Sequence, residues 1–148
     1  MDLQNKIDSD LIQAQKEKNE QVRDTLRYLK SAFKNASIQK QAELTEQEIV
    51  SVIQKEIRQR KDAVLQYRST RPELAAKEEQ EISIIEVYLP AQLTDDQLKE
   101  IIDQAIKNTG ATEMKDMGKI MSQVMPQVQG KADGSRVSKL TKELLSHE

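Results

Sequence analysis

Apolar residues recur every three or four positions through the first part of the chain, which is the spacing of one face of an α-helix. Faces of this kind are carried by residues 3–14, 22–36, 49–67 and 74–89. Pro72 separates the last two, because a proline disfavours helix in the residue before it and suits a first helical turn. The pattern predicts an N-terminal bundle of about four long helices over residues 1–89.

Two threonines mark predicted helix starts. Thr45 and Thr94 each follow a leucine and are followed three residues later by Glu48 or Gln97. In such a capping box the threonine side chain accepts a hydrogen bond from the amide three residues on, and the Glu or Gln side chain accepts one from the threonine N–H. We therefore predict that a helix begins after each threonine.

The chain changes character near position 90. All four glycines and two of the three prolines lie from there onward, which indicates shorter helices joined by tight turns. Three apolar faces follow; we expect Gly110 to end the first helix, and Pro126 with Gly130 to end the second. The sequence predicts a small three-helix C-terminal module over residues 90–148, and the fold class is all-α.

The composition agrees with the all-α fold class and indicates the cellular compartment. Aromatic residues make up 3% of the chain, too few for a typical sheet, whereas helix-forming Ala, Leu, Gln, Glu and Lys abound. There is no cysteine, so disulfides and thiolate chemistry are excluded. The first ten residues are polar, and no apolar run approaches the roughly 20 residues of a membrane span. We expect a cytoplasmic protein with no membrane association.

Residues able to perform catalysis are scarce. The single histidine, His147, lies next to the C-terminus and is interpreted as a solvated tail residue, so no catalytic triad can be built. Residues 130–135 contain two glycines but follow no strand, which argues against a phosphate-binding loop. The sequence predicts no catalytic residue and no cofactor.

Two clusters invite a metal hypothesis, and for both we favour another interpretation. Glu78, Glu79 and Glu81 form a solvated face or pair with the basic residues of the 55–61 segment. Four methionines at helical spacing suit packing against a core or partner better than metal binding. They are Met114, Met117, Met121 and Met125. No metal site is predicted.

The distribution of charge is more informative than the total of −2. Residues 90–113 hold two basic and five acidic side chains, whereas residues 114–145 hold six basic and three acidic ones. Basic groups beside turns with free amides suit phosphate binding, and the alternative is an ordinary solvated helix face. The six candidate RNA-binding residues are Lys115, Lys119, Lys131, Arg136, Lys139 and Lys142. We expect Gly118 to permit close helix packing, and Gly130 and Gly134 to shape turns.

A secondary basic stripe lies on the second predicted helix. Its members follow at intervals of four, three and four residues, so they share one face. We favour pairing with acidic residues of neighbouring helices, or solvation, over ligand binding for this stripe. It consists of Arg23, Arg27, Lys30 and Lys34.

Several stretches, in this order and spacing, resemble the YqeY family. They are residues 23–27 (RDTLR), 55–61 (KEIRQRK), 81–82 (EI), 88–93 (YLPAQL), 117–121 (MGKIM) and 130–134 (GKADG). Family proteins are similar to the C-terminal tail of GatB, a subunit of the amidotransferase that converts mischarged Glu-tRNA(Gln) or Asp-tRNA(Asn). The resemblance implies a long-helix N-terminal bundle, a three-helix C-terminal module and a relation to a tail that touches the outer body of tRNA.

The resemblance sets the functional expectation. It implies a tRNA-associated accessory or binding module, with tRNA or another structured RNA as partner and no catalytic site of its own. One alternative is a protein-interaction adaptor that uses the N-terminal helices or the methionine face. Another is the family-level activity of a carbon–nitrogen ligase with glutamine as amide donor, although no catalytic residue carries over to this chain. The sequence leaves the oligomeric state open.

Overall fold

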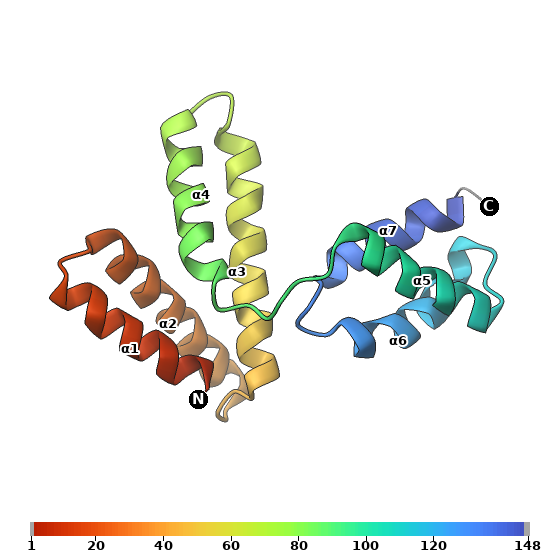
Figure 1. Cartoon of the computed structure of the whole chain (residues 1–148), viewed down its shortest axis with the longest axis horizontal. Coiled ribbons are helices and arrows are strands. Elements are labelled where there is room, and N and C mark those ends of the chain that lie inside the picture. The colour runs from red at the N-terminus through yellow and green to blue at the C-terminus, as the bar shows by residue number, and fades with distance from the viewer. Residues whose placement is uncertain (1, 147–148) are drawn as a thin grey trace. The chain divides into compact units, whose positions relative to one another are not determined.

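The computed structural model describes residues 2–146, which form seven α-helices and one 3₁₀ turn and contain no strand (Figure 1). The all-α prediction is confirmed. The chain divides into two compact units, Met1–Leu89 and Pro90–Glu148. Within the described residues, no helix combines the length and apolarity needed to span a membrane.

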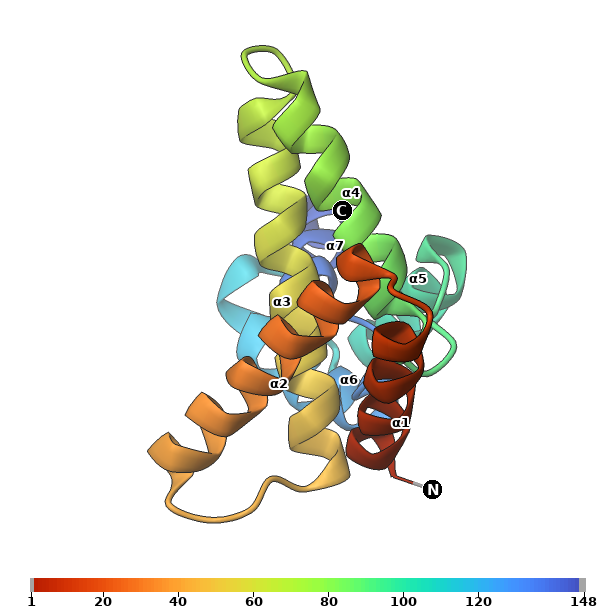
Figure 2. The same cartoon turned by 90° about the vertical axis from the view of Figure 1, so that its left-hand side faces the viewer.

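The first unit consists of two helical hairpins. Its helices are α1 (Leu3–Lys16), α2 (Glu20–Lys40), α3 (Glu46–Tyr67) and α4 (Pro72–Glu86). Helices α1 and α2 form one antiparallel pair and α3 and α4 the other, and α2 crosses the second pair (Figure 2). Pro72 occupies the first turn of α4, where its missing N–H costs no helical hydrogen bond.

The core of the first unit is made from the apolar positions that recur at helical spacing. The buried cluster contains Ile7, Leu11, Leu26, Leu29, Phe33, Ile49, Ile53, Ile57, Ile85 and Tyr88. Tyr88 lies just beyond α4, and its hydroxyl donates to Asp10 Oδ2 at 2.6 Å. Burial, followed by this hydrogen bond, raises the pKa of Tyr88. The Tyr88 hydroxyl therefore stays protonated and donates the hydrogen bond that joins α1 to the end of this unit.

Both predicted capping boxes are confirmed. The Glu48 amide donates to Thr45 Oγ1 at 3.2 Å, and the Thr45 amide donates to a Glu48 carboxylate oxygen at 3.2 Å. Thr94 and Gln97 make the same pair of bonds, at 3.0 and 3.2 Å. Each box satisfies amides that have no partner within their own helix.

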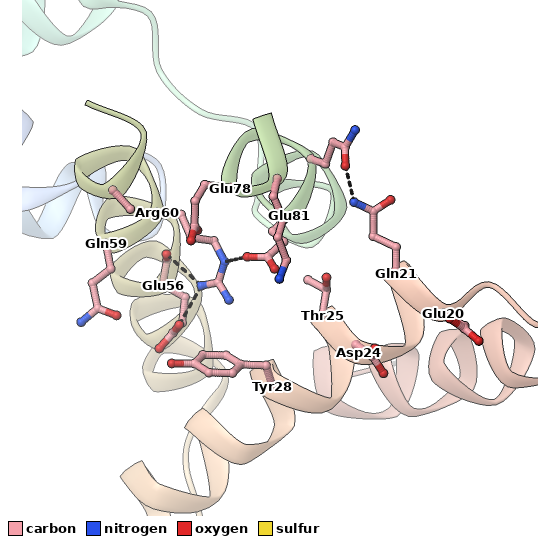
Figure 3. Close-up of a pocket in the computed structure, with 13 residues that line it drawn as sticks. Glu20, Gln21, Asp24, Thr25, Tyr28, Glu56, Gln59, Arg60, Glu78 and Glu81 are labelled. Atoms are coloured by element: carbon pink, nitrogen blue, oxygen red, sulfur yellow. Dashed lines mark hydrogen bonds and ion pairs between the residues drawn. The ribbon is translucent and has the colours of Figure 1, made fainter. Parts of the chain in front are cut away.

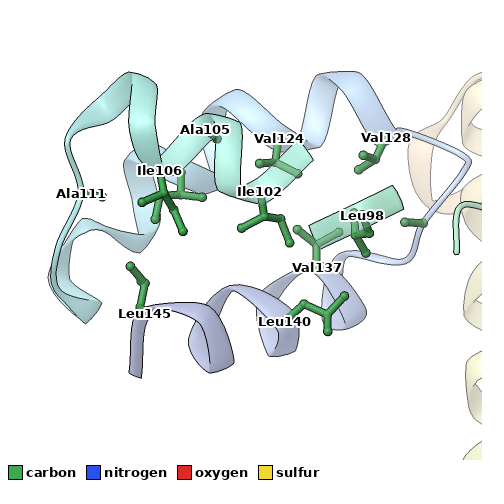
Figure 4. Packing of buried hydrophobic residues seen from close by; sticks show 12 residues of the cluster. Leu98, Ile102, Ala105, Ile106, Ala111, Val124, Val128, Val137, Leu140 and Leu145 are labelled. Carbon is green, nitrogen blue, oxygen red and sulfur yellow. The ribbon is translucent and has the colours of Figure 1, made fainter. Parts of the chain in front are cut away.

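The second unit packs three helices and a short turn around an apolar core. They are α5 (Asp95–Thr109), η1 (Met114–Asp116), α6 (Met117–Val128) and α7 (Gly134–Ser146). Figure 4 shows Val137, near the start of α7, beside Leu98, and Leu145 at its far end facing Ala111. Gly110 ends α5 with a φ of +69°, as predicted, and α6 ends at Val128, between Pro126 and Gly130.

Candidate functional site

The structure separates the six predicted RNA-binding residues. Lys131 and Arg136 lie near the start of α5, because the Lys131 carbonyl accepts from the Leu93 amide and Arg136 bonds to Leu93 and Asp95. Lys115 belongs to η1, which packs against α7 and α6. The six residues therefore lie on several elements of the second unit: η1, α6, the turn before α7, and α7.

The Arg136 side chain forms hydrogen bonds that hold the second unit together. Its Nε and Nη2 donate to Asp95 Oδ1 at 2.9 and 2.7 Å, and Nη2 also donates to the Leu93 carbonyl at 2.7 Å. These bonds tie the first turn of α7 to the start of α5. We therefore leave Arg136 out of the phosphate-binding surface proposed below.

The five lysines differ in their acidic neighbours. Lys115 Nζ lies 3.1 Å from Glu113, but both side chains are more than half exposed, so the pair is weak. Asp116 accepts backbone hydrogen bonds from Thr112 and Glu113, which lower its pKa, and the charge of Lys119 lowers it further. The other four of these five lysines are exposed, and none of the four forms an ion pair within 4.0 Å with any of residues 2–146. We call them the lysine surface: Lys119, Lys131, Lys139 and Lys142.

The surroundings of the three glycines can be compared with the roles predicted for them. Gly130 has a φ of +79° and shapes the turn before α7. Gly134 begins α7, and a Cβ there would make an ordinary contact of 3.6 Å with Met125 Cε. The prediction that Gly118 permits close helix packing is wrong, because Gly118 lies exposed in the first turn of α6. Apart from its chain neighbours and the backbone of its own helix, an added Cβ would meet no described atom within 4 Å.

The secondary stripe on α2 lies among carboxylates. Arg23 Nε lies 2.9 Å from Asp24, and Lys30 Nζ lies 2.8 Å from Asp8 on α1. The hydrogen bond with Arg23 lowers the pKa of Asp24. Lys34 borders a shallow groove of about 290 Å³ between α1 and α2.

Sequence reasoning missed a cleft of about 770 Å³ between α2, α3 and α4 (Figure 3). Arg60 of α3 is 7% exposed in its wall. Its Nη1 donates to Glu56 Oε2 at 2.8 Å and its Nε donates to Glu81 Oε2 at 3.1 Å. The guanidinium carbon lies 5.0 Å from the centroid of the Tyr28 ring, a cation–π distance. The predicted pairing of the α4 carboxylates with the 55–61 segment is confirmed for Glu81 and Arg60.

Acidic side chains dominate the cleft. Five carboxylates line it against two cations, Arg60 and Lys77. The carboxylates are those of Glu20, Asp24, Glu56, Glu78 and Glu81. Burial opposes the charge of Arg60, but the Glu56 hydrogen bond and the charges of Glu81 and Glu56 raise its pKa, so it stays protonated. Burial, followed by the charge of Glu81, raises the pKa of Glu78, so a further negative charge is disfavoured here.

One signal could have located this cleft. Arg60 follows Ile57 by three residues and precedes Val64 by four, so it stands on the apolar face of α3. A charged residue at such a position must find buried partners. Within residues 2–146 no group of three or more His, Cys, Asp or Glu side chains is arranged to hold a metal, and His147 lies outside the described residues.

The described residues thus define a small all-α protein of two helical units. The family described as Yqey-like protein matches residues 4–145, and the chain belongs to this family. It is 31% identical, over 75% of its length, to altered inheritance of mitochondria protein 41, mitochondrial, of Vanderwaltozyma polyspora. The protein of the same name from Pyrenophora tritici-repentis is 27% identical over 95% of this chain. The matches span 64% and 79% of those two proteins.

Proposed function

We propose that this chain is an RNA-associated accessory module whose second unit binds the phosphates of tRNA or another structured RNA. The lysine surface carries the proposal: four exposed ammonium groups without an ion pair in the described residues. The relation of the family to the GatB tail supports tRNA as the RNA. The lack of cysteine suits a reducing compartment, and we propose the cytoplasm.

The distribution of the four lysines over one turn and two helices favours an extended polyanion over a small anion. Lys131 occupies a turn, Lys119 lies in the first turn of α6, and Lys139 and Lys142 lie on α7. Groups spread in this way can contact successive phosphates of a nucleic-acid backbone, whereas a small anion needs donors that converge. Each phosphate contact releases a counterion, so affinity falls as salt rises.

The salt dependence of tRNA affinity tests this proposal. Lys119, Lys131 and Lys139 are changed together to Gln, which removes three contacts and lowers the slope of log affinity against log salt by roughly 2–3. The matched control changes Lys16, Lys34 and Lys55, three exposed lysines of the first unit, in the same way. We expect the control to keep nearly the wild-type slope. Equal slopes for the two variants, or no tRNA binding by the wild type at low salt, would refute the proposal.

The second candidate function is a protein-interaction adaptor. One observation favours it: five large apolar side chains of the first unit are more than half exposed. They are Ile12, Tyr28, Ile38, Leu65 and Val87. An apolar contact depends little on salt, so an adaptor would hold its partner across the same salt series in which RNA is released.

A further inference from the structure

The cleft between α2, α3 and α4 is lined by a hydroxyl that forms no hydrogen bond among residues 2–146, on a threonine that is otherwise buried. It belongs to Thr25, which is 4% exposed and lines the cleft. A threonine inside a helix commonly bonds to the carbonyl four residues earlier, as Thr141 does to Val137 at 2.7 Å. Figure 3 shows the Thr25 side chain directed into the space between α2 and α4. The hydroxyl is thus placed to bond to a group that enters the cleft.

The charges around Thr25 favour a positively charged group as the one that enters the cleft. Arg60 engages one oxygen of Glu56 and one of Glu81, which leaves the second oxygen of each carboxylate able to accept. Glu78 lies close enough to Glu81 for their charges to repel. An incoming cation relieves this repulsion, whereas an anion increases it.

The cleft already holds one guanidinium. Arg60 lies between carboxylates and the ring of Tyr28, which is itself 57% exposed and lines the cleft. The same groups, with Glu78 and the Thr25 hydroxyl added, can accept hydrogen bonds from a second cation and offer it an aromatic surface.

We propose that this cleft binds an organic cation through an ammonium or guanidinium group, supplied by a free polyamine or by a lysine or arginine side chain of a partner. Thr25 and Glu78 accept hydrogen bonds from the cationic group, and Tyr28 contacts its alkyl chain or its plane. The proposal concerns the first unit and does not depend on RNA binding by the second.

Titration of the full-length, ¹⁵N-labelled chain at low salt tests the proposal. The probes are spermidine and the peptide acetyl-Gly-Arg-Gly-amide, which represent the two sources. We expect shifts at the cleft residues, including Thr25 and Tyr28, with at least one probe. Tetramethylammonium carries the charge but donates no hydrogen bond, and it is expected to bind at least tenfold more weakly.

Variants show whether binding of the probes depends on the cleft residues or only on the presence of acidic side chains anywhere on the surface. Glu78→Gln removes one charge-assisted bond and should weaken binding about tenfold. Glu79→Gln is the matched control, because Glu79 is the next residue of α4, is exposed and does not line the cleft; it should change affinity less than about twofold. Thr25→Val keeps the shape of the side chain and should weaken binding about threefold to tenfold if the hydroxyl accepts a bond.

Several results would overturn the proposal. They are no shifts in the cleft with either probe, equal losses for Glu78→Gln and Glu79→Gln, or wild-type affinity in Thr25→Val. Denaturation of each variant checks its fold, and Glu78→Gln is expected to be at least as stable as the wild type. Binding of spermidine alone identifies a free polyamine as the source, and binding of the peptide alone identifies a partner's side chain.

Discussion

The two units differ in where they place charged side chains. Among the described residues, the first unit buries Arg60 and Glu56, whereas the second buries no charged residue and only one polar side chain, Thr141. Thr141 satisfies its hydroxyl on the Val137 carbonyl within its own helix. The core of the second unit is otherwise apolar, and its lysines remain on the surface.

This difference is the physical basis of the different ligand classes proposed for the two units. Charge held inside helix packing needs partners from several helices, and those partners leave a polar cleft around it. An apolar core makes no such demand, so basic residues outside it are available to a polyanion. The two proposals above therefore differ in the charge of the ligand: an organic cation for the first unit and a nucleic-acid backbone for the second.

The largest effect that separates the two units is expected from their anchoring arginines. Arg60→Ala leaves Glu56 and Glu81 without their cation in a buried setting and should destabilise the fold by about 3–5 kcal/mol. Arg136→Ala removes bonds from a side chain that is 33% exposed and should cost about 1 kcal/mol. Urea denaturation of both variants measures the difference. Similar losses of unfolding free energy would show that the two arginines contribute equally to stability. The two units would then not differ in how strongly they depend on a buried charge.

A smaller effect is expected where the two units are alike. Thr45→Ala and Thr94→Ala each remove a side-chain cap and should each cost about 1 kcal/mol. Thr45→Ser and Thr94→Ser retain the hydroxyl and serve as matched controls, with stability close to the wild type. A loss at only one of the two threonines, measured by denaturation, would show that the two capping boxes are not equivalent.

The helices and their starts are predictable because their causes are local. A cap joins residues three positions apart, and an apolar face repeats within one turn, so both can be read from a short window of sequence. The roles of Arg60 and Arg136 depend on contacts across 21 and 41 positions. Such contacts follow from which helices pack together, and periodicity does not specify that pairing. The prediction for Gly118 failed for the same reason, because whether a helix approaches that position is a property of the packing.

The smallest effect concerns the pH dependence of stability at Glu78. The pKa of Glu78 is raised in the folded chain above its ordinary value of 4.5. Glu78 is protonated in both states at low pH, and as pH rises above that value the unfolded chain ionises it more readily than the folded chain does. The wild type should therefore lose stability as pH rises through the raised pKa. Glu78→Gln should be more stable at pH 7 by about 0.5 kcal/mol, since solvent screens much of the effect, and the gain should vanish near pH 4. Denaturation curves of the variant and of Glu79→Gln between pH 4 and 7 measure this difference. A gain that persists at pH 4 would indicate a change in packing and would argue against repulsion among the cleft carboxylates.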